Sequence, residues 1–166
     1  MTKIKICGIK TLTDALAGIE AGSDYLGFNF YLKSVRYIEK QACAEITSVL
    51  KKEYPHVKRV GVFVNSTAEE IKDITETCSL DLAQLHGDET LEVVASFNGK
   101  AFKAFRGIPT DMNGFVRNDA PAFLVDAAVK GTYGGSGVTA DWNRAAELAK
   151  KATETGKSVK EVVAEE

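Results

Sequence analysis

Two side chains, far apart in the chain, have types and positions suited to proton transfer. Cys7 lies near the end of the β-rich run KIKICGI, and Asp126 near the end of the apolar run AFLVDA. A free cysteine is most often a small buried residue, but Lys5 shares a strand face with Cys7 and a cationic neighbour favours the thiolate. A half-buried carboxyl group can keep its proton and donate it, although capping the following loop is the structural alternative. Together they suggest a general base and a general acid.

A glycine-rich loop, GTYGGSG, follows Asp126 at residues 131–137. Its backbone amides, with Gly134, Gly135 and Ser136 at the centre, could bind a phosphate group. Glycines in a long loop are equally what a mobile lid needs, because they absorb large changes in φ and ψ. From the residues alone, both interpretations stay open.

Two other polar residues are candidates for a binding site. Arg36, in LKSVRYIEK, carries a planar fork suited to a carboxylate, although a loop arginine is often only solvated. His86 follows Gln84 by two residues in QLHGDE, so both side chains face the same way if this segment is a strand. A neutral, hydrogen-bonded core histidine is the alternative for His86.

Short β-rich runs alternate with helical ones, and this alternation predicts the elements that position these residues. Strands are expected at 3–9, 24–30, 57–64, 82–87, 100–107 and 122–127. Helices are expected at about 12–21, 38–53, 67–78, 88–97 and 110–117, and from 141 onward. Thr67 and Glu70 have the spacing of a capping box, and Gly22 stands where a helix should end.

Six βα units in succession predict a single α/β domain with an all-parallel sheet. A doubly wound sheet that binds a nucleotide usually has a glycine-rich phosphate loop after its first strand, whereas here that strand runs into CGIKTLTD. A (β/α) barrel is therefore favoured. Most of the strands lead at their carboxyl ends to a residue able to bind or react, and that rim is where a barrel places its active site. These residues are Cys7, Asn29, Asn65, His86, Arg106 and Asp126.

Length and charge narrow the function further. The chain has 166 residues, enough for one domain, and a net charge of −2, which provides no basic surface for nucleic acid or an anionic membrane. It has neither a signal-peptide pattern nor an apolar run of membrane-spanning length, so we expect a cytoplasmic protein. The three cysteines form no CxxC or zinc spacing, so reduced thiols are expected and no metal or cofactor is implied.

The motifs together resemble one family, phosphoribosylanthranilate isomerase, the (β/α)8-barrel enzyme of tryptophan biosynthesis. The resemblance covers about residues 3–148 and is specific as a combination of motifs, although no single motif is. Besides the strand that ends at Asp126, the matching segments are KICGIK (5–10), GFNFYLKSVRYI (27–38), VGVFVN (60–65), QLHGDE (84–89) and GTYGGSGVTADW (131–142).

This resemblance implies roles for the candidate residues. Cys7 corresponds to the general base, Asp126 to the general acid, and Arg36 to the arginine that holds the anthranilate carboxylate. Gln84 and His86 are expected at the substrate, and the loop with Gly134, Gly135 and Ser136 resembles the flexible loop that folds over it. The implied reaction is an Amadori rearrangement of a phosphosugar-anthranilate, with no metal and no cofactor.

The sequence departs from the family after about residue 148. The seventh and eighth strands of the family are not recognisable, and residues 149–166 read as an unfamiliar helical tail. We therefore expect an incomplete barrel of about six βα units whose edge strands are open. The alternative to an isomerase is a catalytically silent partial barrel, natural or engineered, that self-associates through those edges. Another phosphosugar isomerase of barrel type would leave Arg36 and the Cys7 motif unexplained.

Overall fold

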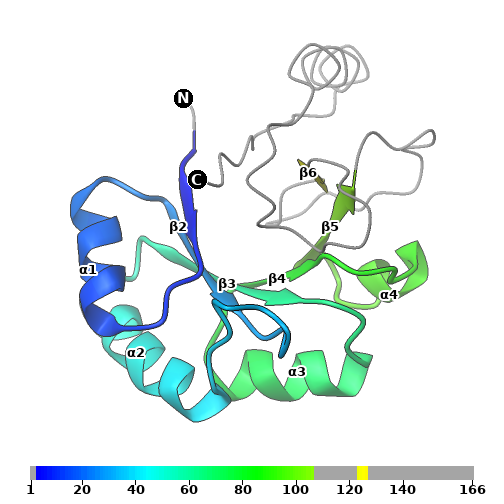
Figure 1. The fold of residues 1–166 in the computed structure, drawn as a ribbon, viewed down its shortest axis with the longest axis horizontal. Coiled ribbons are helices and arrows are strands. Elements are labelled where there is room, and N and C mark those ends of the chain that lie inside the picture. Colours follow the sequence, from blue (N-terminus) through cyan, green and yellow to red (C-terminus); the bar gives the residue numbers. More distant parts are fainter. Residues whose placement is uncertain (1–2, 107–122, 127–166) are drawn as a thin grey trace.

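The computed structural model describes residues 3–106 and 123–126 (Figure 1). Several expected features lie outside these residues: the helix at 110–117, the loop with Gly134, Gly135 and Ser136, the helix from 141 and the tail at 149–166. The six expected strands and the first four expected helices are all present.

Strands and helices alternate along the described chain. The strands are β1 (Lys5–Cys7), β2 (Tyr25–Asn29), β3 (Lys58–Phe63), β4 (Leu82–Leu85), β5 (Ala101–Arg106) and β6 (Phe123–Asp126). The helices are α1 (Leu12–Glu20), α2 (Lys40–Glu53), α3 (Ala68–Thr77) and α4 (Leu91–Ala95). None of the helices in this part of the chain is long and apolar enough to cross a membrane.

The strands form one parallel sheet in the order β1-β2-β3-β4-β5-β6, so each strand pairs with the next along the sequence. A doubly wound sheet would reverse direction at a switch point, and no reversal occurs here. The sheet curls, and the four helices lie along its convex side (Figure 1). The observed arrangement confirms the expectation of a barrel-type fold.

Alternation along the strands divides the core into two clusters. The larger one fills the space between sheet and helices and includes Phe28, Phe63 and Leu85. The smaller one lies on the concave face of the sheet, which is the interior of the barrel. Its buried members are Val60, Leu82, Phe102, Ala104 and Leu124, with Tyr25 packed against them.

Local sequence explains where the helices start and stop. The predicted capping box at the start of α3 is confirmed: the Thr67 hydroxyl accepts from the Glu70 amide, and the Glu70 carboxylate accepts from the Thr67 amide. Thr11 and Asp14 form a second box at the start of α1, which was not predicted. Gly22 follows the end of α1 with φ of +88°, a conformation that glycine adopts without strain.

The described elements are slightly shorter than predicted, and β1 and α4 differ most. β1 was expected at 3–9 but ends at Cys7, because the next two backbone amides both turn onto the Gly27 carbonyl. The fourth helix was expected at 88–97 but covers only Leu91–Ala95. Its expected first turn is not helical, because Asp88 is bound to Asn65 and Arg106 and Glu89 is bound to Lys103 instead.

Candidate active site

The candidate residues gather on the interior face at the carboxyl ends of the strands. Partners in a parallel sheet share a face, and the register pairs Cys7 with Gly27, Gln84 with Phe102 and Arg106 with Asp126. Following these pairs across the sheet places Cys7, Gln84 and Asp126 on the same side. Cys7 and Asp126 thus lie on the two outermost described strands, β1 and β6, and face the same side of the sheet as Gln84.

Cys7 lies against a glycine of the next strand. The thiol is free and only partly buried. A Cβ atom placed on Gly27 would come within 2.7 Å of the Cys7 Sγ atom, so the sulfur occupies the space that a side chain would need. Lys5 shares the interior face with Cys7 and is 8% exposed. The Cys7 thiol thus lies directly against the backbone of β2 at Gly27.

Arg36 lies next to the turn that follows Cys7. A Cβ atom placed on Gly8 would meet the Arg36 side chain, first its Cδ atom and then its Cβ and Cγ atoms. Asn29 organises this loop: its side-chain amide donates to the Ser34 hydroxyl at 3.1 Å, and its side-chain oxygen accepts from the Tyr31 amide. The Ser34 hydroxyl also accepts from the Arg36 amide at 3.2 Å. The end of β2 therefore brings Arg36 and Cys7 into one region.

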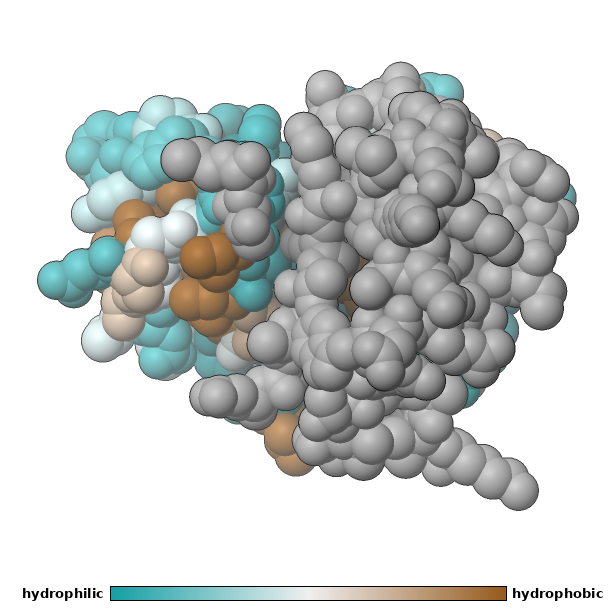
Figure 2. All heavy atoms as spheres, turned by 90° about the horizontal axis from the view of Figure 1, so that it is seen from above, coloured by the Kyte–Doolittle hydropathy of each residue, from teal (hydrophilic) through white to brown (hydrophobic). Residues whose placement is uncertain are grey.

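The loop that carries Arg36 also carries exposed apolar side chains. Leu32 is 77% exposed and Val35 is 90% exposed. The described part of the face in Figure 2 is mostly hydrophilic, with some hydrophobic atoms among it.

Within residues 3–106 and 123–126, no group of three or more histidine, cysteine or acidic side chains could hold a metal ion.

A chain of polar side chains leads to Asp126. The Gln84 side-chain amide and the Nδ1 atom of His86 are 3.2 Å apart, and the His86 Nε2 atom lies 3.3 Å from an Asp126 carboxylate oxygen. Gln84 is 2% exposed and His86 4%, whereas the Asp126 side chain is 20% exposed. The carboxyl group of Asp126 is thus the member of this chain that reaches the mouth of the barrel.

A buried ion pair supports the loop after β4 from the outer face of the sheet. The Lys103 ammonium group donates to the Glu89 carboxylate at 2.8 Å and to the Gly87 carbonyl at 2.7 Å. The two charged side chains are only 7% and 4% exposed. Glu89 also accepts from the backbone amides of Gly87 and Asn65. Three donors on one carboxylate fix the backbone just beyond His86.

A second set of contacts ties the ends of β3, β4 and β5 together. The Asn65 side-chain oxygen accepts from the Asp88 amide at 2.6 Å, and Arg106 donates to the Asp88 carboxylate at 2.6 Å. The predicted rim residues Asn65 and Arg106 are therefore linked through Asp88. The sequence does not predict the pairing of Lys103 with Glu89; its one local signal is the acidic pair in QLHGDE.

The other two cysteines are structural, as expected. Cys43 and Cys78 are free and fully buried between α2 and α3. A hydrogen bond with Cys78, together with burial, raises the pKa of Cys43, and the same bond lowers the pKa of Cys78. The Cys78 thiol also donates to the Lys40 carbonyl. Neither thiol reaches the barrel mouth.

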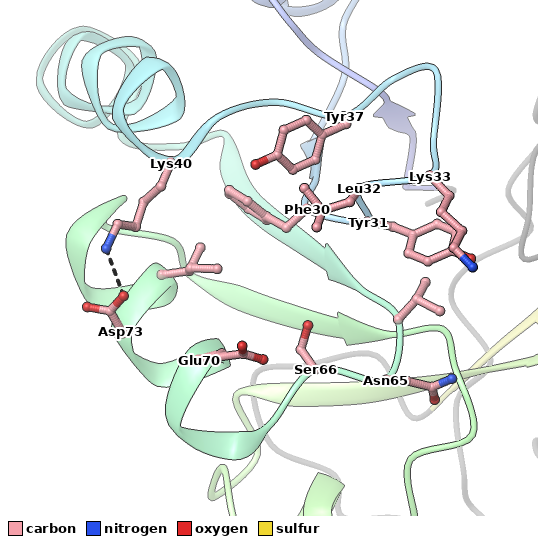
Figure 3. Close-up of a pocket in the computed structure, with 12 residues that line it drawn as sticks. Phe30, Tyr31, Leu32, Lys33, Tyr37, Lys40, Asn65, Ser66, Glu70 and Asp73 are labelled. Atoms are coloured by element: carbon pink, nitrogen blue, oxygen red, sulfur yellow. Dashed lines mark hydrogen bonds and ion pairs between the residues drawn. The ribbon is translucent and has the colours of Figure 1, made fainter.

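A pocket of about 480 Å³ lies outside the barrel mouth, between the loop after β2 and helices α2 and α3 (Figure 3). An ion pair of 2.8 Å between Lys40 and Asp73 crosses one side of it. None of the candidate catalytic residues lines this pocket. Its walls include Phe30, Tyr31, Leu32, Lys33, Tyr37, Asn65, Ser66 and Glu70.

Comparison with known proteins gives one consistent result. A family model described as N-(5'-phosphoribosyl)anthranilate (PRA) isomerase matches residues 4–162. The protein named N-(5'-phosphoribosyl)anthranilate isomerase of Geotalea daltonii is 43% identical over 152 residues, which cover 91% of this chain and 72% of that protein. The protein of the same name from Citrifermentans bemidjiense is 42% identical, with 87% and 69% covered.

Solved structures agree with these relatives. Phosphoribosyl anthranilate isomerase from Thermotoga maritima is 34% identical with a TM-score of 0.75, covering 91% of this chain and 73% of that one. A phosphoribosyl anthranilate isomerase solved in complex with reduced 1-(o-carboxyphenylamino)-1-deoxyribulose 5-phosphate is 32% identical with a TM-score of 0.71, covering 91% and 72%. The chain thus spans about seven tenths of the length of its relatives.

Proposed function

The chain belongs to the N-(5'-phosphoribosyl)anthranilate isomerase family of tryptophan biosynthesis, and on that premise we propose that Cys7 and Asp126 carry out the isomerisation as base and acid. The product is 1-(2-carboxyphenylamino)-1-deoxyribulose 5-phosphate. The observation that carries this proposal is that both side chains face the interior at the carboxyl ends of their strands. That is the end at which (β/α) barrels perform chemistry.

The acid step opens the sugar ring. Asp126 donates its proton to the ring oxygen as the bond between that oxygen and C1 breaks, and the anthranilate nitrogen forms a Schiff base with C1. Asp126 suits this step because its side chain is four-fifths buried yet reaches the mouth. Burial disfavours the charged carboxylate, and a general acid has to hold its proton until the substrate is bound.

The base step follows at the neighbouring carbon. Cys7 as the thiolate removes the proton from C2, and the electron pair moves to form a C1=C2 bond while the nitrogen becomes neutral. The enolamine then loses its C2 hydroxyl proton and gains a proton at C1, which gives the aminoketose. Lys5 lies on the same strand face as Cys7, two residues earlier in β1.

Arg36 is proposed to bind the anthranilate carboxylate. Its side chain rests on Gly8, one residue after Cys7, so a carboxylate held there leaves the sugar end of the substrate near the thiol. A guanidinium fork binds a carboxylate with two parallel hydrogen bonds, which fixes orientation as well as affinity. We include Gln84 and His86 in the proposed site because His86 contacts Asp126 and Gln84 contacts His86. We also propose that the loop with Gly134, Gly135 and Ser136 closes over the substrate.

We also propose how the chain assembles and where it is located. Among the described strands, β1 and β6 each pair with only one neighbour, and this favours a homo-oligomer formed through these edges. The net charge of −2 and the free thiols favour a cytoplasmic location. Sedimentation of a stable monomer would count against the oligomer.

The test is turnover of freshly prepared N-(5'-phosphoribosyl)anthranilate, followed by loss of its fluorescence. We expect turnover that a Cys7→Ala, Asp126→Ala double variant lacks, and inhibition by free phosphate if phosphate contacts support binding. Cys78→Ala is the matched control, since it also removes a thiol but lies away from the barrel mouth. A parent chain no faster than the double variant would reject the proposal and leave the catalytically silent partial barrel.

A further inference from the structure

The backbone of β2 forms the seat of the Cys7 thiol. Gly27 is the register partner of Cys7 and is buried. A Cβ atom on Gly27 would lie 2.7 Å from the Cys7 Sγ atom, 3.1 Å from its Cα and 3.2 Å from its Cβ. Any residue larger than glycine at this position would therefore push the thiol away from its present place.

The Gly27 carbonyl also holds the turn that follows Cys7. It accepts hydrogen bonds from the Gly8 amide at 2.9 Å and from the Ile9 amide at 3.0 Å. Gly8 itself has φ of +89°, which a residue with a side chain rarely adopts, and the stem of Arg36 fills the space above it. The same peptide thus sets the position of Cys7 and of the surface on which Arg36 rests.

We infer that Gly27 is a positioning residue of the active site: its missing side chain seats the Cys7 sulfur, and its carbonyl fixes the turn that carries Arg36. This inference rests on the proposed function, because the thiol matters for catalysis only if Cys7 is the base. A misplacement of about 1 Å can reduce a rate by about a hundredfold, so a displaced sulfur should have a large effect.

The test is Gly27→Ala in the full chain. We expect kcat to fall by about tenfold or more, and by more than KM rises, because the alanine displaces the base. The rate at which iodoacetamide alkylates Cys7, located by mass spectrometry, should change as well. That second measurement does not depend on turnover.

Gly61→Ala is the matched control. A Cβ atom on Gly61 of β3 would lie 2.7 Å from both Leu80 and Phe63, so the clash is of the same size but on the face that packs against the helices. We expect Gly61→Ala to lower stability while kcat per folded molecule and Cys7 alkylation stay as in the parent.

The outcomes separate the inference from the proposed function. An unchanged kcat and an unchanged alkylation rate in folded Gly27→Ala would overturn the inference. If the parent has no turnover, the proposed function fails and the alkylation rate alone decides the position of the thiol. If Gly27→Ala does not fold, adding Cys7→Ala should restore part of the stability, because it removes the nearest clashing atom, and no recovery would overturn the inference.

Discussion

The Nε2 atom of His86 lies 3.3 Å from the carboxylate oxygen Oδ2 of Asp126, and the histidine is almost fully buried. The other ring nitrogen faces the side-chain amide of Gln84 at 3.2 Å. A ring held between two polar groups has a defined orientation. We therefore propose that His86 positions the carboxyl group of Asp126, the proposed acid.

Replacing this histidine should slow the reaction more than it weakens binding. For His86→Asn we expect kcat to fall by about tenfold or more, because general acid catalysis contributes about a hundredfold or more in total. KM should change little. Steady-state kinetics with His56→Asn as control checks this, since His56 is the other histidine and is exposed. Equal effects of the two substitutions would contradict the assignment.

A substitution in the loop that carries Arg36 should raise KM more than it lowers kcat, the reverse of the effect expected for His86→Asn. Ser34→Ala removes the hydroxyl that accepts from both the Asn29 side chain and the Arg36 amide. Each hydrogen bond contributes about 1 kcal/mol, so we expect KM to rise about fivefold or more while kcat changes less. Ser48→Ala, on an exposed position of α2, is the control. A fall in kcat without a rise in KM would argue against a binding role for Arg36.

The buried pair of Lys103 and Glu89 should dominate stability at the rim. Lys103→Met leaves the Glu89 carboxylate buried without its ion partner, and breaking a buried pair in this way costs about 3–5 kcal/mol. Denaturant unfolding checks this value. Adding Glu89→Gln should recover part of the loss.

The exposed ion pair of Lys40 and Asp73 is the control for the stability effect of Lys103→Met. Asp73→Asn breaks the contact with Lys40, whose side chain is 45% exposed, and we expect little change in the free energy of unfolding. If Lys103→Met and Asp73→Asn had the same small effect, burial of the Lys103 pair would not matter to stability.

Asp24 should make stability depend on acid pH. The hydrogen bond from Lys3, followed by that from the Ile4 amide, lowers the pKa of Asp24 below its ordinary value of 3.8. A lowered folded-state pKa stabilises the protein above the unfolded pKa, and this stabilisation is lost as pH falls through the folded value. Asp24→Asn should therefore lower the free energy of unfolding at pH 6 and have a smaller effect at pH 3. A larger effect at pH 3 would contradict this sign.

Much of the fold could be predicted from the sequence. The six strands follow from the β-rich runs, and the faces that residues share within each strand follow from their alternation. The ends of elements were less predictable. β1 ends early because its next two amides turn onto the Gly27 carbonyl, eighteen and nineteen residues away, and such a contact leaves no local pattern in the sequence.

The supporting contacts of the site were the part that could not be predicted. The ion pair of Lys103 and Glu89 joins a strand to a loop fourteen residues earlier, and either residue alone looks like an ordinary surface charge. Gly27 likewise reads as a glycine within a strand, and only the register with Cys7 reveals why a side chain is excluded there. Such contacts depend on the three-dimensional register rather than on spacing.

The central claim is that Cys7 and Asp126 act together in one site. The most direct test is kcat/KM on fresh substrate for the parent, Cys7→Ala, Asp126→Asn and the double variant. We expect each single substitution to reduce kcat/KM by about a thousandfold or more and the double variant to be little worse, because residues that act as a unit are not additive. Parent-like turnover in either single variant would contradict the account.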